Sequence, residues 1–165
     1  MSLKKDLTII FVSFYSKNLI EKPISQIDSD ISIIVIENSL DHELKKNLED
    51  KYSNVRVVIP DNNTGNGGGA NIGLRLAQTK FVLYLDIDVE LSQTAIEKLY
   101  SYANKLNDFS ILGPSIKGLT YKENYFSKKN IYEKVHSMNF ITGCALFFNM
   151  TALKEIGFYD ENIFL

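Results

Sequence analysis

The stretch Phe81-Val82-Leu83-Tyr84-Leu85-Asp86-Ile87-Asp88-Val89 is an apolar run that ends in two aspartates separated by one residue. The run predicts a strand that is covered on both faces of its sheet. Because side chains alternate along a strand, we expect Asp86 and Asp88 to point to the same side. Like charges held that close repel each other, and a divalent cation between them removes the repulsion. Aspartates after a strand are also typical of a solvated turn, so this stretch alone leaves both interpretations open.

Strand-like and helix-like segments alternate around this stretch, which is typical of an α/β domain with a largely parallel sheet. The expected strands are the apolar runs Leu7–Ser13, Ile31–Glu37, Val55–Ile59 and Phe81–Leu85. The expected helices lie at about 18–27, 41–50 and 69–78, and a longer helix follows Ser92, its expected N-cap. The sequence therefore predicts four βα units by residue 107.

The pattern changes after residue 107. Ile111 and Leu112 predict a short strand, and the polar residues 115–137 predict a loop or an irregular hairpin. Residues 140–148 then predict another strand. We expect a short helix at 151–156 that is capped by Thr151 and ended by Gly157.

Length and composition indicate one globular domain, since 165 residues with 45% hydrophobic and 23% charged residues can bury a core. The net charge is −2 and no basic block appears, so we expect no nucleic-acid partner. The single cysteine, Cys144, excludes an intrachain disulfide and fits a reducing compartment. The apolar runs are too short for a signal segment or a membrane span. We therefore expect a cytoplasmic protein, and contact with the inner face of the membrane is compatible with this sequence.

A glycine-rich stretch, Asp61-Asn62-Asn63-Thr64-Gly65-Asn66-Gly67-Gly68-Gly69-Ala70-Asn71-Ile72-Gly73, joins the third strand to the next helix. Glycines let a ligand approach the backbone closely, and the free N–H groups at a helix N-terminus favour phosphate. A flexible surface loop is the simpler interpretation, but so many Gly and Asn residues in one connection are costly to order.

Two functional interpretations of the loop remain. Gly65-x-Gly67-x-x-Ala70 fits the loose dinucleotide fingerprint, with Asp86 at the spacing for a ribose contact. That fingerprint needs its turn immediately after the strand, whereas residues 60–64 intervene, and it leaves Asp88 without a role. The other interpretation combines the loop and the aspartates into one site.

The carboxyl ends of parallel strands meet at one edge of a sheet, where such proteins bind ligands. Glu37, the loop Asn63–Asn71 and the pair Asp86/Asp88 all follow strands, so we expect them to converge. A nucleoside diphosphate needs this combination, because its base and ribose need a recognition surface and its phosphates need a cation. The sequence thus predicts a nucleoside-diphosphate site with Mg²⁺ or Mn²⁺.

Short blocks spread over nearly the whole chain resemble, in order, the family 2 glycosyltransferases of the GT-A fold, and rhamnosyltransferase-like members above all. The blocks are Val12–Ser16, Ile33–Ser39, Asn63–Gly73, Asp86–Asp88, Gly113-Pro114, Thr142–Ala145 and Gly157–Glu161. The resemblance implies one GT-A domain over 1–165, a largely parallel sheet flanked by helices. Its nucleotide-binding part would be 1–92 and its acceptor-side part 93–165.

The resemblance also implies an enzyme that transfers a sugar, with inversion, from a nucleotide-diphosphate sugar to a hydroxyl of a glycan or lipid-linked acceptor in cell-surface polysaccharide synthesis. In such enzymes the positions of Asp86 and Asp88 hold the metal, and Asp86 also contacts the donor. The family commonly has Asp at the position of Glu37. The implied nucleotide-sugar-binding residues are Ser13, Phe14, Glu37, Asn63, Gly65, Asn66, Gly67, Asn71 and Asp86. Thr142 and Gly143 would lie on the acceptor side.

In this family the catalytic base comes from a Glu-Asp block a few residues beyond the segment that Phe158–Glu161 resembles. No such block stands before Leu165, so we expect the base beyond Leu165, a C-terminally truncated chain, and donor binding with weak or absent transfer. The alternatives that stay open are an NAD-dependent oxidoreductase and a non-catalytic sugar-nucleotide-binding module. A homodimer is compatible with the sequence.

Overall fold

The computed structural model describes residues 2–106, 108–115, 126–132 and 135–163. The elements are α1 Leu3–Asp6, β1 Leu7–Ser13, α2 Glu21–Ser25, β2 Ser32–Glu37, α3 His42–Lys51, β3 Val55–Val58, α4 Gly65–Leu76, β4 Phe81–Leu85, α5 Gln93–Lys105, β5 Ile111–Leu112, β6 Phe126–Tyr132, β7 Val135–Met138, β8 Ala145–Asn149 and α6 Met150–Ile156.

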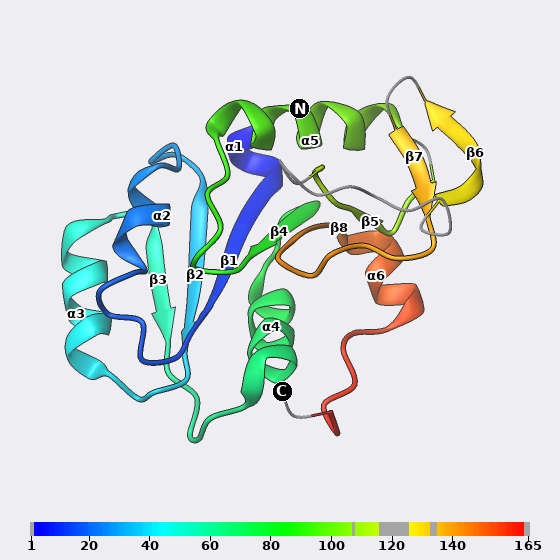
Figure 1. The fold of residues 1–165 in the computed structure, drawn as a ribbon. Helices are drawn as coiled ribbons and strands as arrows, with labels where there is room; N and C mark the ends of the chain where they lie inside the picture. The colour runs from blue at the N-terminus through cyan, green and yellow to red at the C-terminus, as the bar shows by residue number, and fades with distance from the viewer. Residues whose placement is uncertain (1, 107, 116–125, 133–134, 164–165) are drawn as a thin grey trace.

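The central feature is a six-stranded sheet with the order β3-β2-β1-β4-β8-β5 (Figure 1). Strands β1 to β4 pair in parallel, and β8 runs antiparallel to β4 and β5. Strands β6 and β7 form a separate antiparallel pair. The prediction of an α/β fold with a largely parallel sheet is confirmed. The order reverses between β1 and β4, and such switch points are where open α/β sheets bind ligands.

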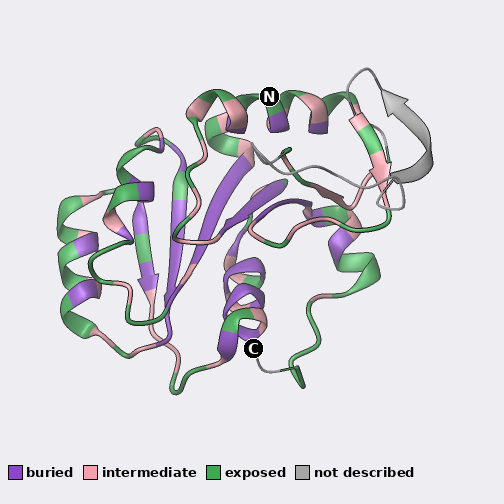
Figure 2. Ribbon diagram, in the orientation of Figure 1, coloured by how far each residue is buried: buried purple, intermediate pink, exposed green. Residues whose placement is uncertain are grey.

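Helices cover both faces of this sheet, because each strand alternates between two apolar clusters. Ile9 and Phe11 of β1 belong to the cluster with the apolar residues of α2, α3 and α5. Ile10, between them, belongs to the cluster with α4 and α6. In Figure 2 the central strands β1, β2, β4 and β8 are accordingly buried nearly throughout, while α3 and α5 alternate buried and exposed residues.

Helix α4 lies directly on β1, because two of its glycines face that strand. A Cβ at Gly69 would come within 2.8 Å of Val12 Cγ1, and one at Gly73 within 2.7 Å of Ile10 Cγ2. Both distances are shorter than carbon atoms tolerate, so only glycine allows this approach. The packing brings the N-terminus of α4 to the carboxyl ends of β1 and β4.

Two helix predictions need correction at their starts. Helix α4 begins at Gly65 rather than Gly69, because the Asn63 side chain accepts a hydrogen bond from the Gly65 N–H at 2.9 Å and Gly65 adopts a φ of +70°. Helix α2 covers only Glu21–Ser25 of the expected 18–27. Pro23 lacks an N–H and fits only the first turn, so the helix begins just before it. Helix α1 was not predicted.

The last strand and helix also differ from the prediction. Strand β8 covers Ala145–Asn149 instead of 140–148, because its partner β4 offers only five residues for antiparallel pairing. Phe140 is 60% exposed accordingly. Helix α6 is capped by Asn149, whose side chain accepts from the Thr151 N–H at 3.2 Å, and not by Thr151.

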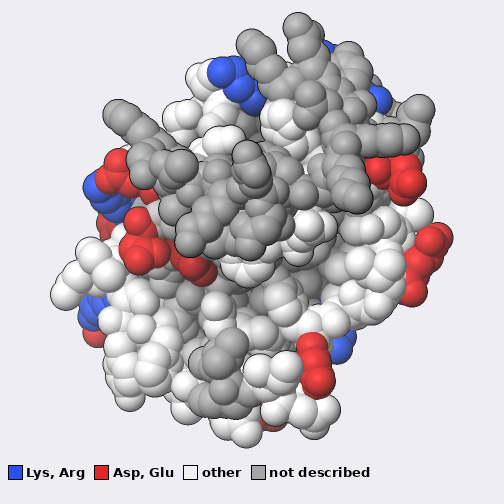
Figure 3. All heavy atoms as spheres, turned by 45° about the vertical axis from the view of Figure 1, so that its right-hand side comes forward, with Lys and Arg blue, Asp and Glu red and all other residues white. Residues whose placement is uncertain are grey.

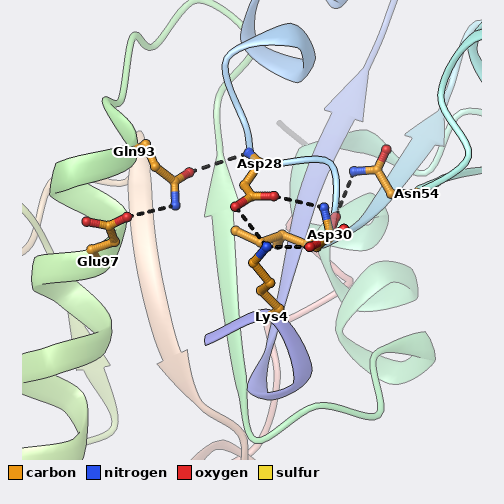
Figure 4. A network of polar contacts seen from close by, with 7 residues as sticks. Lys4, Asp28, Asp30, Asn54, Gln93 and Glu97 are labelled. Carbon is orange, nitrogen blue, oxygen red and sulfur yellow. Dashed lines mark hydrogen bonds and ion pairs between the residues drawn. The ribbon is translucent and has the colours of Figure 1, made fainter. Parts of the chain in front are cut away.

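A polar network holds the edge where the strands begin (Figure 4). Lys4, next to the start of β1, forms ion pairs with both Asp28 and Asp30 in the loop before β2. The Asp28 N–H donates to Gln93 of α5 at 3.4 Å, so the network joins three segments that are distant in sequence. It lies at the opposite edge of the sheet from the carboxyl ends of β1 and β4.

Surface charges elsewhere are mixed in sign. On the face in Figure 3, acidic and basic side chains are scattered, and in several places the two signs adjoin. Several form exposed ion pairs, such as Lys51–Glu21 at 2.6 Å and Lys17–Glu43 at 2.8 Å. Exposed pairs of this kind contribute little to stability, typically about 0–1 kcal/mol.

Candidate functional site

A cavity of about 490 Å³ opens at the carboxyl edge of the sheet, at the switch point between β1 and β4. It is lined by Val12, Phe14, Ser16, Leu19, Asn38, Asn63, Gly65, Asn66, Tyr84, Asp86, Ile87 and Asp88. The structure therefore brings together residues from β1, β2, the N-terminus of α4 and the end of β4. Of the predicted donor and metal residues, the lining includes Phe14, Asn63, Gly65, Asn66, Asp86 and Asp88.

Asp86 and Asp88 share this cavity, although not by strand alternation. Strand β4 ends at Leu85, and the chain then turns, with the Val89 N–H donating to the Asp86 carbonyl at 3.1 Å. The Asp86 N–H donates to the Cys144 carbonyl at 2.9 Å, which fixes the start of the turn against the loop before β8. The expected convergence of the two carboxylates is thus achieved by a turn.

The electrostatics of the pair suit a cation. Burial raises the pKa of the Asp86 carboxyl above its ordinary value, and the neighbouring charge of Asp88 raises it further, whereas the hydrogen bond from Tyr84 lowers it. No Lys, Arg or His lines the cavity, and neither carboxylate forms an ion pair within the described ranges. The second Asp-x-Asp of the chain, Asp28 and Asp30, differs because both of its carboxylates form an ion pair with Lys4.

Tyr84 of β4 connects Asp86 to helix α4. Its hydroxyl lies 2.8 Å from Asp86 Oδ1 and 2.6 Å from Asn66 Oδ1. The ring is only 4% exposed. Burial, and then the charge of Asp86, raises the pKa of Tyr84 far above its ordinary value, so the hydroxyl keeps its proton.

Asn38, which follows β2, holds the glycine-rich loop at the cavity. Its side-chain amide donates to the Gly65 carbonyl at 3.0 Å, and its Oδ1 accepts from the Thr64 hydroxyl at 3.0 Å. Because Asn38 is buried, these bonds have little competition from water. They orient the first turn of α4, whose N–H groups have no partner within the helix, toward the cavity.

An aromatic and apolar surface forms another side of the cavity. Phe14 is 50% exposed and Leu19 is 59% exposed, and both line the cavity. Tyr15 packs edge-on against Phe14 with ring centroids 4.5 Å apart, in a turn where Tyr15 has a φ of +50°. Exposed flat side chains of this kind can stack against a planar base.

Two of the predicted donor residues, Ser13 and Glu37, lie beneath the cavity wall. Both are fully buried. The Glu37 carboxylate accepts hydrogen bonds from the Ser13 hydroxyl and from the N–H and hydroxyl of Ser39. In this structure the carboxylate therefore joins the ends of β1 and β2 and is absent from the cavity lining.

Asn71 and Gly67 contact the C-terminal segment instead of the cavity. The buried Asn71 amide donates to the Tyr159 carbonyl at 2.9 Å and to Glu161 Oε1 at 2.8 Å, and its Oδ1 accepts from the Tyr159 N–H at 3.0 Å. A Cβ at Gly67 would meet the Tyr159 side chain at 3.6 Å. Burial, with a contribution from the Asp86 charge, raises the pKa of Tyr159 to about 12. Tyr159 is therefore held close to the site by helix α4.

The predicted acceptor residues, Thr142 and Gly143, lie in the loop before β8 and outside the cavity lining. Gly143 is exposed, with open space around it. The loop adjoins the site through the Cys144 carbonyl, which accepts from the Asp86 N–H. Burial, and then the charge of Asp86, raises the pKa of the Cys144 thiol, which keeps it protonated.

Sequence reasoning did not select Asn38 or Tyr84 as site residues. Asn38 had a usable signal, since it directly follows Glu37 at a strand end. Tyr84 had a weaker one, a single polar hydroxyl within an apolar strand. Its partner Asn66 belongs to a different element, so the pairing depends on how α4 packs on the sheet.

The carboxylates fit a hard divalent cation. Within the described ranges, Oδ2 of Asp86 accepts no hydrogen bond, Asp88 is exposed, and no cluster of three or more His, Cys, Asp and Glu residues is found. Two carboxylates leave coordination positions for phosphate oxygens and water, which is the usual way that Mg²⁺ is bound together with a substrate. None of the described helices is both long enough and apolar enough to span a membrane.

Residues 15–157 match the family described as Glycosyl transferase family 2. The low-salt glycan biosynthesis hexosyltransferase Agl10 of Haloferax volcanii is 23% identical over 180 residues, which cover 97% of this chain and 58% of that protein. The poly(ribitol-phosphate) beta-N-acetylglucosaminyltransferase TarP of Staphylococcus aureus is 28% identical over 139 residues, which cover 77% of this chain and 42% of that protein. The chain spans about half the length of these curated relatives.

Solved structures show the same fold. The crystal structure of S. aureus TarS 1-349 superposes with a TM-score of 0.72 at 15% identity, covering 97% of this chain and 52% of that one. That fragment is also known in complex with UDP-GlcNAc. The mannosyltransferase PcManGT from Pyrobaculum calidifontis, in complex with GDP-Man and Mn²⁺, superposes with a TM-score of 0.68 at 15% identity. The match covers 96% of this chain and 48% of that one. The predicted GT-A fold is confirmed.

Proposed function

The chain belongs to glycosyl transferase family 2, and we propose that its cavity binds a nucleotide-diphosphate sugar through Mg²⁺ or Mn²⁺ held by Asp86 and Asp88. One observation carries this proposal: two carboxylates without a cationic partner line a cavity that contains no basic side chain. Such a cavity repels a diphosphate, and a divalent cation reverses the sign of that interaction. The TarS and PcManGT complexes, with UDP-GlcNAc and with GDP-Man and Mn²⁺, support this class of ligand.

The cavity suggests an orientation for the donor. Phe14 and Leu19 would contact the base, because they form the exposed apolar side. The diphosphate would lie between Asp86 and the first turn of α4, where free N–H groups favour anions. The sugar would then extend toward Tyr159 and the loop that contains Thr142 and Gly143.

We further propose that the complete enzyme transfers the sugar with inversion to a hydroxyl of a glycan or lipid-linked acceptor, in the synthesis of a surface polysaccharide. The glycan named for Agl10 and the poly(ribitol-phosphate) named for TarP support an acceptor of this class. When bound, the cation supplies Lewis-acid stabilisation of the departing diphosphate. Both carboxylates in the cavity are assigned to that cation, so the base that takes the acceptor's proton has to come from elsewhere. We propose a Glu-Asp block beyond Phe158–Glu161 as its source, as the family resemblance implies.

Isothermal titration with UDP, GDP and dTDP, each with and without Mn²⁺, tests the donor site. We expect Mn²⁺ to strengthen binding of at least one nucleotide, and the Asp86→Ala/Asp88→Ala variant to lose that gain. The loss should reach or exceed the roughly 10–100-fold typical of removing an outer-shell partner of a metal, because these residues are the ligands themselves.

The matched control is Asp28→Ala/Asp30→Ala, which removes the chain's other Asp-x-Asp from the opposite edge of the sheet. These carboxylates form ion pairs with Lys4 and do not line the cavity, so nucleotide affinity should stay at the parent value. Equal Mn²⁺-dependent binding by the parent and the Asp86/Asp88 variant would contradict the metal assignment. Metal-independent binding of NAD would favour an oxidoreductase instead.

A further inference from the structure

Tyr84 has a polar group that the packing of β4 does not require. Its ring lies in the cluster between the sheet and α4, with Ile10 and Leu146 as its partners on the neighbouring strands. Phenylalanine would fill the same space. The hydroxyl is therefore the part of Tyr84 that calls for a separate explanation, and it ends between Asp86 Oδ1 at 2.8 Å and Asn66 Oδ1 at 2.6 Å.

The hydrogen bonding of this group has one consistent solution. A hydroxyl carries a single proton, and the carboxylate of Asp86 is a stronger acceptor than an amide oxygen. The Asn66 amide can turn so that its NH₂ group donates to the Tyr84 oxygen. The order Asn66 to Tyr84 to Asp86 then gives each pair a donor and an acceptor and fixes Asp86 Oδ1, while Oδ2 accepts no hydrogen bond from the described residues.

We infer that Tyr84 is a positioning residue, which orients the Asp86 carboxylate toward the cation and links it to the first turn of α4. The inference depends on the proposed metal site, since it assigns a partner to one of the proposed ligands. Without the hydroxyl, the half-buried carboxylate can rotate about its side-chain bonds, and binding a cation must then restrict that motion. Outer-shell partners of metal ligands act in this way.

The test is Tyr84→Phe, which keeps the ring and removes the hydroxyl. Mn²⁺ affinity is measured by electron paramagnetic resonance at saturating UDP, or GDP if that nucleotide binds better, and nucleotide affinity is measured separately in EDTA. We expect Mn²⁺ affinity to fall about tenfold, the lower end of the outer-shell range, and metal-free nucleotide affinity to change less than twofold. A purely structural role would weaken both affinities equally.

Tyr100→Phe is the matched control, because the Tyr100 hydroxyl donates to Asp6 Oδ2 at 2.6 Å far from the cavity. This variant loses the same kind of hydrogen bond and should keep the Mn²⁺ affinity of the parent. Asn66→Ala removes the other anchor from an exposed position and should weaken Mn²⁺ binding by a smaller factor. In the double variant Tyr84→Phe/Asn66→Ala, the fold-loss of Mn²⁺ affinity should be smaller than the product of the fold-losses in the two single variants, because both changes break the same chain of hydrogen bonds.

Three outcomes separate the hypotheses. If the parent shows no Mn²⁺-dependent nucleotide binding, the proposed metal site itself fails. If the parent binds Mn²⁺ and Tyr84→Phe binds it within twofold of the parent, the site stands and the role of Tyr84 is wrong. If Tyr84→Phe does not fold, as judged by circular dichroism, Asn66→Ala decides, and parent-like Mn²⁺ affinity in that variant overturns the inference.

Discussion

Gly73 lies in the last turn of α4, where the absence of a side chain allows the helix to approach β1 closely. A Cβ there would approach Ile10 Cγ2 to 2.7 Å and Ile10 Cδ1 to 2.9 Å. The equivalent approach at Gly69 involves Val12, one turn closer to the cavity. The glycine-rich stretch thus has two separate roles: Gly65 forms the positive-φ start of the helix, while Gly69 and Gly73 allow close packing on the sheet.

The first prediction at this scale concerns Gly73→Ala. Overpacking against Ile10 should cost about 1–3 kcal/mol, offset by about 1 kcal/mol of gained helix propensity, so the free energy of unfolding should fall by up to about 2 kcal/mol. Urea denaturation measures this change. Gly67→Ala is the control, since its Cβ would make an ordinary 3.6 Å contact with Tyr159 and should not destabilise.

A double-mutant cycle with Ile10→Ala sharpens that prediction. Ile10 is fully buried, so its truncation alone should cost about 2–5 kcal/mol. It also removes the Ile10 side-chain carbons that a Cβ at position 73 would clash with. The free energy of unfolding of the double variant should therefore fall by less than the sum of the two single decreases. Additive losses would show that α4 shifts away from β1 without strain.

At the scale of elements, the segment from Phe158 to Glu161 is held on helix α4 by side chains and not by a sheet. The Asn71 side-chain amide donates to the Tyr159 carbonyl and accepts from the Tyr159 N–H, as a neighbouring strand would. Arg75, one turn along the helix, forms an ion pair with Glu161 at 2.7 Å and lies over the Phe158 ring at 5.4 Å. These contacts connect the helix whose N-terminus borders the cavity to the segment that carries Tyr159.

We predict that Asn71→Ala releases this segment. The variant loses three hydrogen bonds. Each contributes about 1 kcal/mol and water replaces part of it, so the free energy of unfolding should fall by about 1–3 kcal/mol. Amide hydrogen exchange should show faster exchange of the Tyr159 N–H. Asn104→Ala, an exposed change on α5, should leave that exchange rate unaltered. Unchanged protection of Tyr159 in Asn71→Ala would refute the role given to Asn71.

For the whole molecule, the strand order explains why the site lies where it does. Strands β2 and β3 extend on one side of β1 and β4 on the other, so the loops after β1 and β4 diverge and leave the cavity between them. The surface ion pairs, including Lys22–Glu90, lie outside the cavity lining and leave its two carboxylates without a counter-charge. A donor site can therefore form within residues 1–165.

The prediction for the whole molecule is that a 165-residue chain binds the donor without transferring the sugar. A longer form that carries a Glu-Asp block should release nucleoside diphosphate from UDP- or GDP-sugars in the presence of glycan acceptors, because we propose that such a block supplies the base. Coupled detection of released UDP or GDP measures both forms. The control is the longer form with the block changed to Gln-Asn. Release by the short form at a rate close to that of the long form would contradict the assignment of the base.

Much of the fold was predictable, because the strands β1 to β4 are covered on both faces and appear in the sequence as continuous apolar runs. The N-cap Ser92 was equally local, and its side chain accepts a hydrogen bond from the Ala95 N–H; Asp41, expected as the first helical residue, is instead the N-cap of α3. The errors occurred where long-range pairing sets a boundary. Strand β8 starts opposite the end of its antiparallel partner β4, and α4 starts where Asn63 and Asn38 hold Gly65.

The sequence by itself determined the α/β class, the family resemblance and the convergence of polar residues at one edge of the sheet, since all three follow from local patterns and their order. Only the tertiary structure decided which polar side chains are left to bind a ligand. The side chains of Glu37 and Asn71 form hydrogen bonds within the protein. Asp28 and Asp30 form ion pairs with Lys4. Asp86 and Asp88, by contrast, line a cavity that contains no basic side chain. The physical reason is that burial and partners come from segments far apart in the chain, so two identical Asp-x-Asp motifs acquire different chemistry.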